Sequence, residues 1–535
     1  MEAPNDSFKY SSKAFATMTA GCIGSGVVFL TYGMKMAGLA VGISTLIICA
    51  LVSVVTHSIY VVGSLQLGAV DLSTLLMRVS AYKSIRSFLA KRDAKKENQE
   101  DVEKLQKGQK MILTASEVEE MKGSMKFHFK SISIICFLSM AYAVPVYFIL
   151  LRSFTQDLVT HAIFSFPQAK FLEYLKDEYL LSAIYFLLVL PFATKSKVSE
   201  LDFLGWFSVA SFFTLASVIV VRSVILPYSG PMPPVTGEVH IWPVHGPLSA
   251  FKMFTFATYA FLCHCMVVPA VLNVSNCTSK RCIKVISASF TFLLVFSLAL
   301  TISAYTTFGE ATQDNITLNF SPCDIFMGFS RILSCISLCV IIPLFTVSIC
   351  NFIVNDIGLI NYMSDLAVDD VFQVIFDGSD DEDKKKESRA LKLTYVPSNP
   401  NIVLDELVGL LAKNKARAIE SDNQEDFSTE ATLKSIKNGE KFNIWRFMLS
   451  TAILIISIFL SHVAKSCTQY VELFCGYIDA FTASIYPLFV YSIIWGRRKS
   501  LFTNFLVVLS CYISAIGPVL SSIVTTYELF TGTQT

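Results

Sequence analysis

Charge is distributed very unevenly along this chain, and this limits its possible folds more than any other feature. The 535 residues include 43 Lys and Arg and 42 Asp and Glu, of which 22 lie in residues 64–130 and 29 in residues 355–443. The remainder consists of long apolar segments. A soluble enzyme, a disordered chain and a nucleic-acid-binding protein all need many more charges outside such stretches. We therefore expect a polytopic membrane protein that contacts lipid and binds no nucleic acid.

Eleven apolar segments are each close to the length of about 20 residues that crosses a bilayer as a helix. They predict an all-α fold of about eleven transmembrane helices. The segments lie at 13–33, 38–63, 131–151, 178–194, 203–226, 250–273, 285–306, 325–351, 444–464, 470–495 and 501–527. The predicted regions are a terminus (1–12), spans one and two (13–63), a charged insertion (64–130), spans three to eight (131–354), a second charged insertion (355–443), and spans nine to eleven with the C-terminus (444–535).

The positions of Lys and Arg predict the orientation, because short cytoplasmic loops are enriched in both residues. With a cytoplasmic N-terminus, both insertions are cytoplasmic, and so are the loops that carry Lys195, Arg281 and Arg498. The loop after span seven is then outside and carries the sequon Asn315-Ile316-Thr317. We therefore predict glycosylation at Asn315. A multi-pass protein of the plasma membrane or of an acidic organelle, such as a vacuole or lysosome, fits this pattern.

Span one carries three glycines within six residues, Gly21, Gly24 and Gly26, together with Cys22 and Ser25. Each glycine costs a helix about 1 kcal/mol relative to alanine. One interpretation is close helix packing through small residues. The other is a broken helix, whose free amides bind a carboxylate and whose free carbonyls bind an ammonium group or a cation.

Span six places an ionisable residue, His264, near the middle of the membrane, with Pro269 expected to break the helix after it. Ionisable residues within spans are candidates for function, although a neutral histidine bonded to a neighbouring backbone is equally compatible with the sequence. Cys263 and Cys265 flank His264, but adjacent helical residues point to different faces. We therefore expect no metal site there, and no cofactor.

Spans one and six are five spans apart. This is the separation expected of two five-helix repeats that are inverted relative to each other and that each begin with a broken helix. The eleventh span is then an addition to a 5+5 arrangement. The halves share no clear sequence identity, so the repeat is inferred from spacing alone.

Four motifs, in order, resemble those of the amino acid/auxin permease family and in particular its sodium-coupled neutral amino acid transporter branch. In span one they are Gly24-Ser25-Gly26, then Tyr32-Gly33-Met34-Lys35 and Gly38; in span six, Ala260-Phe261-Leu262-Cys263-His264, with Pro269; after span seven, Ala304-Tyr305-Thr306-Thr307-Phe308-Gly309, then Asp314-Asn315-Ile316-Thr317-Leu318-Asn319; and in span eight, Ile342-Pro343-Leu344.

The resemblance implies a leucine-transporter-type fold. It also implies secondary active transport of a small-molecule amino acid, as a symporter with alternating access around spans one and six. Amides near Gly24, Ser25 and Gly26 would hold the substrate carboxylate. Carbonyls around Gly21 and Cys22 would take the amine, and Thr258 and Tyr259 would line the side-chain pocket. The small and neutral residues expected to line the pocket favour a neutral amino acid.

Two departures from the branch predict weak or absent sodium coupling. Members that use sodium carry Asn where this chain has Ala20, and Thr where it has Ile341. Neither residue supplies a side-chain oxygen, and the nearby hydroxyls of Thr19, Ser337 and Thr346 are out of register. A co-transported proton can replace sodium. His264 is then the leading relay candidate, because the reference pKa of histidine is about 6.5.

Two further charged residues are noted within spans, Arg331 in span eight and Asp479 in span ten. Similar depth would allow a structural ion pair between them or a contact in an outer vestibule. A gate, or a proton site at Asp479, is the functional alternative.

A sensor of the same fold is the main competing function. It would bind an amino acid and signal through the insertion at 355–443. An enzyme is not expected, because the chain has no His-Glu-x-x-His, no Gly-x-Ser-x-Gly and no paired carboxylates within a span.

Overall fold

The computed structural model gives an all-α membrane bundle, and every structural statement below refers to the residues it describes. These are 4–23, 26–67, 69, 72, 75–80, 83, 111–112, 131–132, 134–195, 203–225, 227, 234–272, 278–353, 392–393, 444–464, 466–495 and 500–531.

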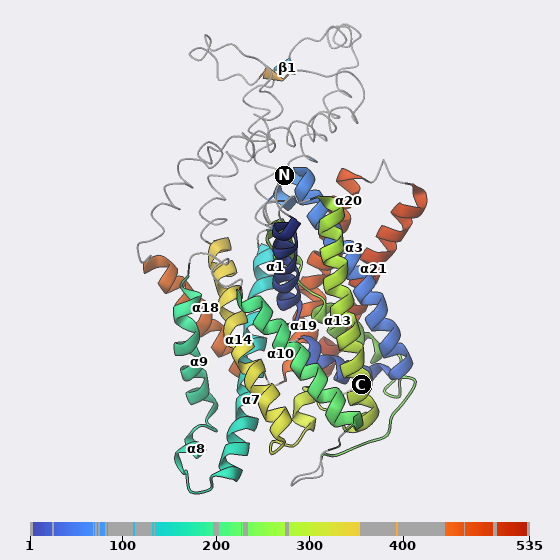
Figure 1. Cartoon of the computed structure of the whole chain (residues 1–535). Helices are drawn as coiled ribbons and strands as arrows, with labels where there is room; N and C mark the ends of the chain where they lie inside the picture. Colours follow the sequence, from blue (N-terminus) through green and yellow to red (C-terminus); the bar gives the residue numbers. More distant parts are fainter. Residues whose placement is uncertain are drawn as a thin grey trace.

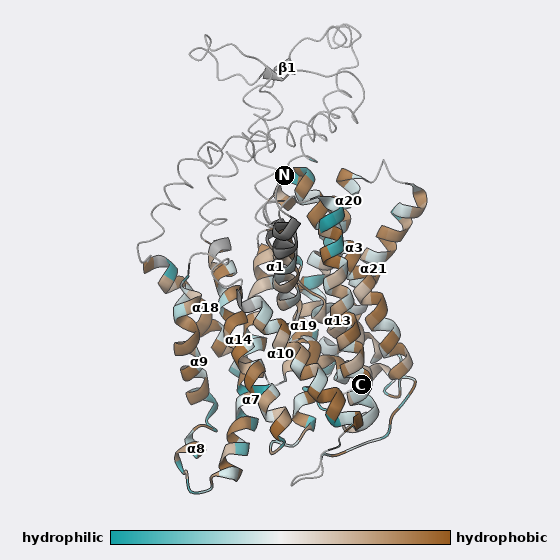
Figure 2. Ribbon diagram, viewed as in Figure 1, coloured by the Kyte–Doolittle hydropathy of each residue, from teal (hydrophilic) through white to brown (hydrophobic). Residues whose placement is uncertain are grey.

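The helices account for ten of the eleven predicted spans by length and composition. Within the described ranges, nine helices are long and apolar enough to cross a membrane, and a bent pair, Ala14–Cys22 with Gly26–Ala37, forms a tenth span. The shorter apolar helix Glu178–Ala193 corresponds to predicted span four. Figure 2 shows hydrophobic residues along most of the length of these helices. Helices suit this environment because they satisfy every backbone polar group within the segment.

The main helices pack together in one bundle, in which helices far apart in the sequence, such as α3 and α21, are neighbours (Figure 1). They are α1 (Pro4–Ile23), α2 (Leu30–Ala37), α3 (Leu39–Leu67), α7 (Ala143–Ser165, within the span Ile134–Ser165), α9 (Glu178–Ala193), α10 (Phe203–Val220), α11 (Ala250–Ala260), α12 (His264–Leu272), α13 (Ser279–Phe308), α14 (Ile325–Phe352), α18 (Ile444–Val463), α19 (Cys467–Phe474), α20 (Tyr486–Ile494) and α21 (Leu501–Thr531).

Short elements complete the chain. The single turns are η1 (Gly26–Phe29), α8 (Phe171–Tyr174), η4 (Gly309–Ala311) and η5 (Ile316–Asn319), and the π-helical turns are η3 (Val221–Ile225), η8 (Cys475–Asp479) and η9 (Phe481–Ile485). Two-residue strands, β1 (Met111–Ile112) and β2 (Lys392–Leu393), pair antiparallel and join the two charged insertions. The rest of both insertions lies outside the described residues.

The two ends of the bundle are named here by what lies at them. The N-terminal side is where α1 begins and α3 ends. The loop side is where α2 and α21 end, and where residues 234–249 and 309–324 connect spans (Figure 1). Residues 234–249 cross this end of the bundle. The carbonyls of His240 and Ile241 accept hydrogen bonds from backbone amides at the start of α3, and the Gly237 amide donates to the Phe308 carbonyl at the end of α13.

Spans one and six pack half against half. The first half of span one, α1, contacts the second half of span six, α12, toward the N-terminal side. The second half of span one, α2, contacts the first half of span six, α11, toward the loop side. This antiparallel pairing of two interrupted helices is the arrangement expected at the centre of an inverted repeat.

Candidate functional site

Span one is interrupted where its glycines lie. Helix α1 ends at Ile23, η1 begins at Gly26, and the two halves differ in direction by 42°. Gly24 and Ser25 lie outside the described residues, so their part in the predicted carboxylate site stays a prediction. The broken-helix interpretation of the glycine cluster is thus the one the fold supports.

Gly26 allows the two interrupted spans to touch backbone to backbone. A Cβ atom built on Gly26 would lie 2.4 Å from the Cα of Ala260, the last residue of α11. Backbone cannot yield as a flexible side chain can, so any larger residue at position 26 must separate the two breaks. Gly21 differs, because an added Cβ would make ordinary contacts of 3.8 Å with Cys263 and 3.9 Å with Met266.

Span six is interrupted immediately before His264, which corrects the prediction of a break at Pro269. Helix α11 ends at Ala260 and α12 runs from His264 to Leu272, through Pro269. The Cys263 carbonyl accepts from the amides of both Met266 and Val267, each at 2.9 Å. This carbonyl fixes the start of α12, and the proline is accommodated within the helix that follows.

The predicted substrate residues lie around these two breaks. Gly21 and Cys22 end the first half of span one, and Gly21 faces span six. Thr258 and Tyr259 are in the last turn of α11, and both side chains are buried. The fold therefore brings together the predicted residues that it describes, from segments more than 200 positions apart in the sequence.

His264 is buried beside a second histidine. Its ring stacks on that of His57 from α3, with centroids 3.8 Å apart, and its Nε2 lies 3.0 Å from Oγ1 of Thr56. The Nδ1 atom of His57 lies 2.7 Å from the carbonyl of Ser53, and its Nε2 lies 3.3 Å from Sγ of Cys263. Stacked rings at this distance disfavour a positive charge on both imidazoles at once.

Asp479 lies on the other side of span six, at the end of the π-helical turn η8. Its carboxylate accepts hydrogen bonds from Tyr142 and from Oγ of Ser139, the latter at 3.1 Å. Ser139 is also 4.0 Å from Sγ of Cys265, the residue after His264. π-Helical turns within α-helices are frequent at functional sites, and this one holds a buried acid among neutral hydroxyl donors.

Tyr142 connects Asp479 to Tyr259, one of the predicted substrate residues. Its ring lies 6.0 Å from that of Tyr259 and 6.3 Å, nearly parallel, from that of Phe474. Cys263 and Cys265 point in different directions, one toward His57 and the other toward Ser139. The histidine pair and a hydroxyl that is bonded to Asp479 thus both contact residues at the span-six break.

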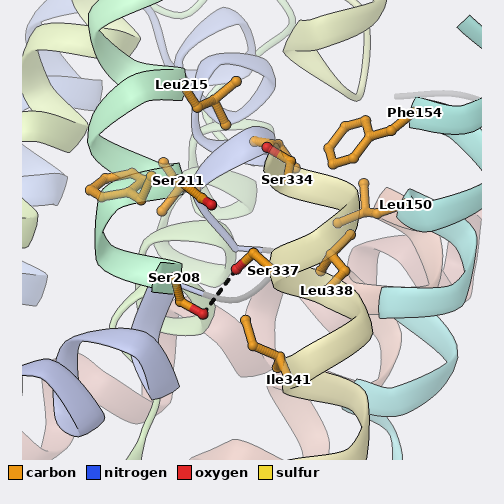
Figure 3. Close-up of a pocket in the computed structure, with 12 residues that line it drawn as sticks. Leu150, Phe154, Ser208, Ser211, Leu215, Ser334, Ser337, Leu338 and Ile341 are labelled. Carbon is orange, nitrogen blue, oxygen red and sulfur yellow. Dashed lines mark hydrogen bonds between the residues drawn. The ribbon is translucent and has the colours of Figure 1, made fainter. Parts of the chain in front are cut away.

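A small cavity of about 30 Å³ adjoins the break in span one. Val27 and Val28 line it, with the hydroxyls of Ser208, Ser211, Ser334 and Ser337 and with apolar side chains that include Ile341 (Figure 3). Ser337 donates to Ser208 at 2.9 Å, and Ser211 donates to the Leu333 carbonyl. A space of this size has room for about one water molecule, and it is too small for an amino acid.

Arg331 does not pair with Asp479, which corrects the predicted ion pair. Its Nη2 lies 3.0 Å from Asp157 of α7, and its guanidinium donates to three carbonyls that follow span seven. The separation arises because Asp479 faces hydroxyls of span three, whereas Arg331 faces the loop-side connection. The three carbonyls are those of Thr317, Phe320 and Ser321.

Asn315 is a structural residue here, against the prediction of glycosylation. Its side chain is 4% exposed, its Oδ1 accepts from the amide and hydroxyl of Thr317, and its Nδ2 donates to Ser153. A glycan needs an accessible Nδ2 atom. The motif at 314–319 therefore folds the loop: Asn319 likewise accepts from the Gln313 amide and donates to the Ala311 carbonyl.

The sequence-based interpretation missed several residues at these sites. His57 was recognisable as a second histidine at membrane depth, but its stacking on His264 depends on the fold. Ser139 and Tyr142 carry no signal, because neutral hydroxyls are common in spans. Lys252 and Glu472 are charged residues within predicted spans six and ten, and this placement could have marked them as candidates for buried charge.

Comparisons with known proteins return a solved transporter but no curated relative. No curated protein matches the sequence. Among solved structures, the chain is similar to a manganese transporter of Eremococcus coleocola. The structure of its complex with an aromatic bis-isothiourea substituted compound shares 9% identity at a TM-score of 0.38 and covers 98% of this chain and 88% of that one. Two mutant forms share 9% identity at TM-scores of 0.39 and 0.40, and each match covers 100% of this chain and 91% of that one. Similarity at this level gives no information on substrate.

The family comparison is decisive. The family described as "Transmembrane amino acid transporter protein" matches residues 131–531, which is most of the chain and includes the span-six break and Asp479. The match begins after span one, so the glycine motif is independent of it. The chain belongs to the transmembrane amino acid transporter family.

Proposed function

We propose that this protein moves a neutral amino acid across the membrane by alternating access, with a proton as the coupling ion. The observation that carries this proposal is the backbone contact of Gly26 with Ala260, where two broken spans cross at the centre of the bundle. Broken membrane helices present unpaired amides and carbonyls at a midplane site, which are the groups that recognise the charged ends of an amino acid.

The proposed substrate contacts follow from this crossing. The amides from Gly24 to Gly26 hold the carboxylate, and carbonyls around Gly21 and Cys22 hold the ammonium group. Thr258 and Tyr259, buried in the last turn of α11, contact the substrate side chain. Their neutral character favours a neutral side chain on the substrate.

Alternating access then consists of moving the paired half-helices. Contacts of α2 with α11 close the loop side, and contacts of α1 with α12 close the N-terminal side. We propose that the N-terminal side is cytoplasmic, in the plasma membrane or in the membrane of an acidic organelle.

A proton is favoured as the coupling ion by the buried groups on either side of span six. Asp479 is bonded to Ser139 and Tyr142, and His264 contacts Thr56 and stacks on His57. These contacts are with neutral hydroxyls or with another imidazole, so neither group is locked in one charge state by an ion pair. Such groups can gain and lose a proton during a transport cycle.

Sodium is disfavoured by the side chains at the two positions where sodium-coupled relatives have oxygen ligands. Ala20 is buried, and Ile341 lines the small cavity beside the span-one break. The cavity's described lining is neutral, so a sodium ion there would be buried without a counter-charge. The hydroxyls that could supply sodium ligands instead are those of Thr19, Ser337 and Thr346, of which Ser337 lines the cavity.

Uptake by proteoliposomes tests the proposal. Purified protein is reconstituted, labelled neutral amino acids are added, and proton and sodium gradients are imposed separately. We expect accumulation driven by an inward proton gradient and insensitive to sodium. A requirement for sodium would reject proton coupling, and Ser337→Ala would then show whether the serine-lined cavity binds it. Binding without uptake would favour the sensor, whose signalling must be lost when residues 355–443 are deleted.

A pair of glycine variants tests the crossing itself. Gly26→Ala places a Cβ 2.4 Å from the Ala260 Cα, whereas Gly21→Ala adds only ordinary contacts. We expect Gly26→Ala to lose uptake by at least about tenfold, equivalent to about 1.4 kcal/mol, and Gly21→Ala to keep most of it. Equal activity of the two variants would contradict the proposed site.

A further inference from the structure

Three charged side chains are buried together at the loop-side end of the bundle, apart from the groups discussed above. Lys252 lies in the first turn of α11, Glu472 in α19 and Glu528 near the end of α21. Their exposed fractions are 6%, 2% and 9%, respectively. Buried charges are rare unless paired, and this group joins three helices of which one, α11, is half of a broken span.

The lysine is not shared equally between the two acids. Its Nζ lies 2.9 and 3.2 Å from the carboxylate oxygens of Glu528, but 3.8 Å from Oε2 of Glu472. Glu472 instead accepts a hydrogen bond of 2.5 Å from Oγ1 of Thr525, one turn before Glu528. Lys252 and Glu528 thus form a bonded pair, and Glu472 is the additional acid.

The charge of this cluster does not balance when all three groups are ionised. One ammonium and two carboxylates leave one buried negative charge, which costs several kcal/mol without a counter-charge. Two carboxylates that share one site hold a proton between them for this reason. The unequal distances are those expected when the proton is on Glu472.

Among the residues that the structure describes, Lys252 is the cation within 4 Å of Glu472. The Tyr32 phenol on α2 interacts with both carboxylates. Arg152 on α7 donates to Ser461 and lies 4.0 Å from Glu178. Asp479, on η8, adds a further acid rather than a cation.

The cluster holds the loop-side end of α11, a half-helix that has to move during alternating access. Helix α11 carries Lys252 at its loop-side end and Thr258 and Tyr259 at its other end, and it packs against α2, α19 and α21. A change in how Lys252 is held is therefore transmitted along a rigid helix to the substrate residues.

We propose that Glu472 is the loop-side entry site for the coupling proton, and that its protonation sets the position of α11 through Lys252. A proton from loop-side water binds the Glu472 carboxylate, and Lys252 then bonds Glu528 alone. Loss of that proton to Asp479, further along the same span, restores the negative charge on Glu472 and draws Lys252 toward it. This inference rests on the proposed proton-coupled transport.

Two isosteric variants separate the roles of the acids. Glu472→Gln keeps an oxygen for the Thr525 hydroxyl but cannot take up a proton. Glu528→Gln leaves Lys252 to pair with Glu472, so Glu472 then takes up a proton only at lower pH. Each variant is reconstituted, and two assays are run: accumulation driven by a pH gradient, and exchange of labelled for unlabelled substrate without a gradient.

The two assays have different expected outcomes. A gradient of one pH unit supports accumulation of about tenfold if one proton moves with each substrate. We expect Glu472→Gln to exchange substrate but to accumulate none, and Glu528→Gln to accumulate it with a pH profile shifted toward acid. Wild-type-like accumulation by Glu472→Gln, or loss of its exchange while its thermal unfolding is unchanged, would overturn the inference.

Two further results keep the test decisive. If Glu472→Gln does not fold, the Glu528→Gln variant decides, because an unshifted pH profile rejects Glu472 as the proton site. If the wild-type protein neither exchanges nor accumulates substrate, the proposed function itself is wrong.

Discussion

Two clusters of buried charge lie toward the loop side of this protein, and they differ in balance. In the first, Arg331 pairs with Asp157 at 3.0 Å and donates to three carbonyls of the connection after span seven. In the second, the single cation Lys252 lies close to two acids, Glu472 and Glu528. A balanced cluster holds a loop in place, whereas a cluster with an extra acid can also bind a proton. The difference separates charge with a structural role from charge that we propose takes part in transport.

The largest expected effect is that of removing the cation from the balanced cluster. Arg331→Met leaves the Asp157 carboxylate without its partner and three carbonyls without a donor. Breaking a buried pair in this way costs about 3–5 kcal/mol, to be measured as thermal unfolding of the purified protein in detergent. The double variant Arg331→Met/Asp157→Asn should recover part of this loss. A loss below about 1 kcal/mol, typical of a surface pair, would contradict a structural role.

The corresponding change in the unbalanced cluster should cost less and depend on pH. Lys252→Met leaves two acids without a cation, but these acids can take up protons in the folded state. We expect a loss of about 1–3 kcal/mol at neutral pH. Because the folded state then binds more protons than the unfolded state, stability should rise as the pH falls. Unfolding midpoints compared between acidic and alkaline buffer measure this, and a loss independent of pH would remove the distinction between the clusters.

Tyr142→Phe should have a smaller effect on stability. It removes one hydrogen bond to the buried Asp479 and leaves the ring contacts with Tyr259 and Phe474 in place. A cost of about 0.5–1.5 kcal/mol is expected. The pH profile of uptake should shift, because the tyrosine hydroxyl stabilises the ionised acid. Phe474→Leu, which alters packing without touching Asp479, is the matched control and should leave that profile unchanged.

No effect is expected from enzymatic deglycosylation at Asn315. The buried Asn315 amide is bonded to Ser153 and Thr317, so the protein should show no change in electrophoretic mobility attributable to this site. A mobility shift that disappears in Asn315→Gln would show that the loop is open when glycosylation occurs.

Much of the fold could be predicted from the sequence, because span length and hydrophobicity are local properties. Ten of the eleven predicted spans are helices long and apolar enough to cross a membrane, and the eleventh matches the shorter helix Glu178–Ala193. The glycines of span one located its break. The break in span six was placed at Pro269 instead of before His264, since the Cys263 carbonyl that starts α12 has no sequence signature.

The candidate sites could be predicted only in part, because charge pairing depends on which faces meet. Asp479 and Arg331 were recognised as unusual, but each has a partner from span three, Tyr142 and Asp157, that spacing does not reveal. Similarly, Glu472 and Glu528 are joined to Lys252 by the packing of three helices that are distant in sequence.

The most direct test of proton-coupled transport is to measure proton entry itself. Wild-type protein is reconstituted into sodium-free vesicles that enclose a pH-sensitive dye, and a neutral amino acid is added outside. The account predicts that adding the amino acid acidifies the vesicle interior. Entry of labelled amino acid without acidification, or only after sodium is supplied, would contradict it.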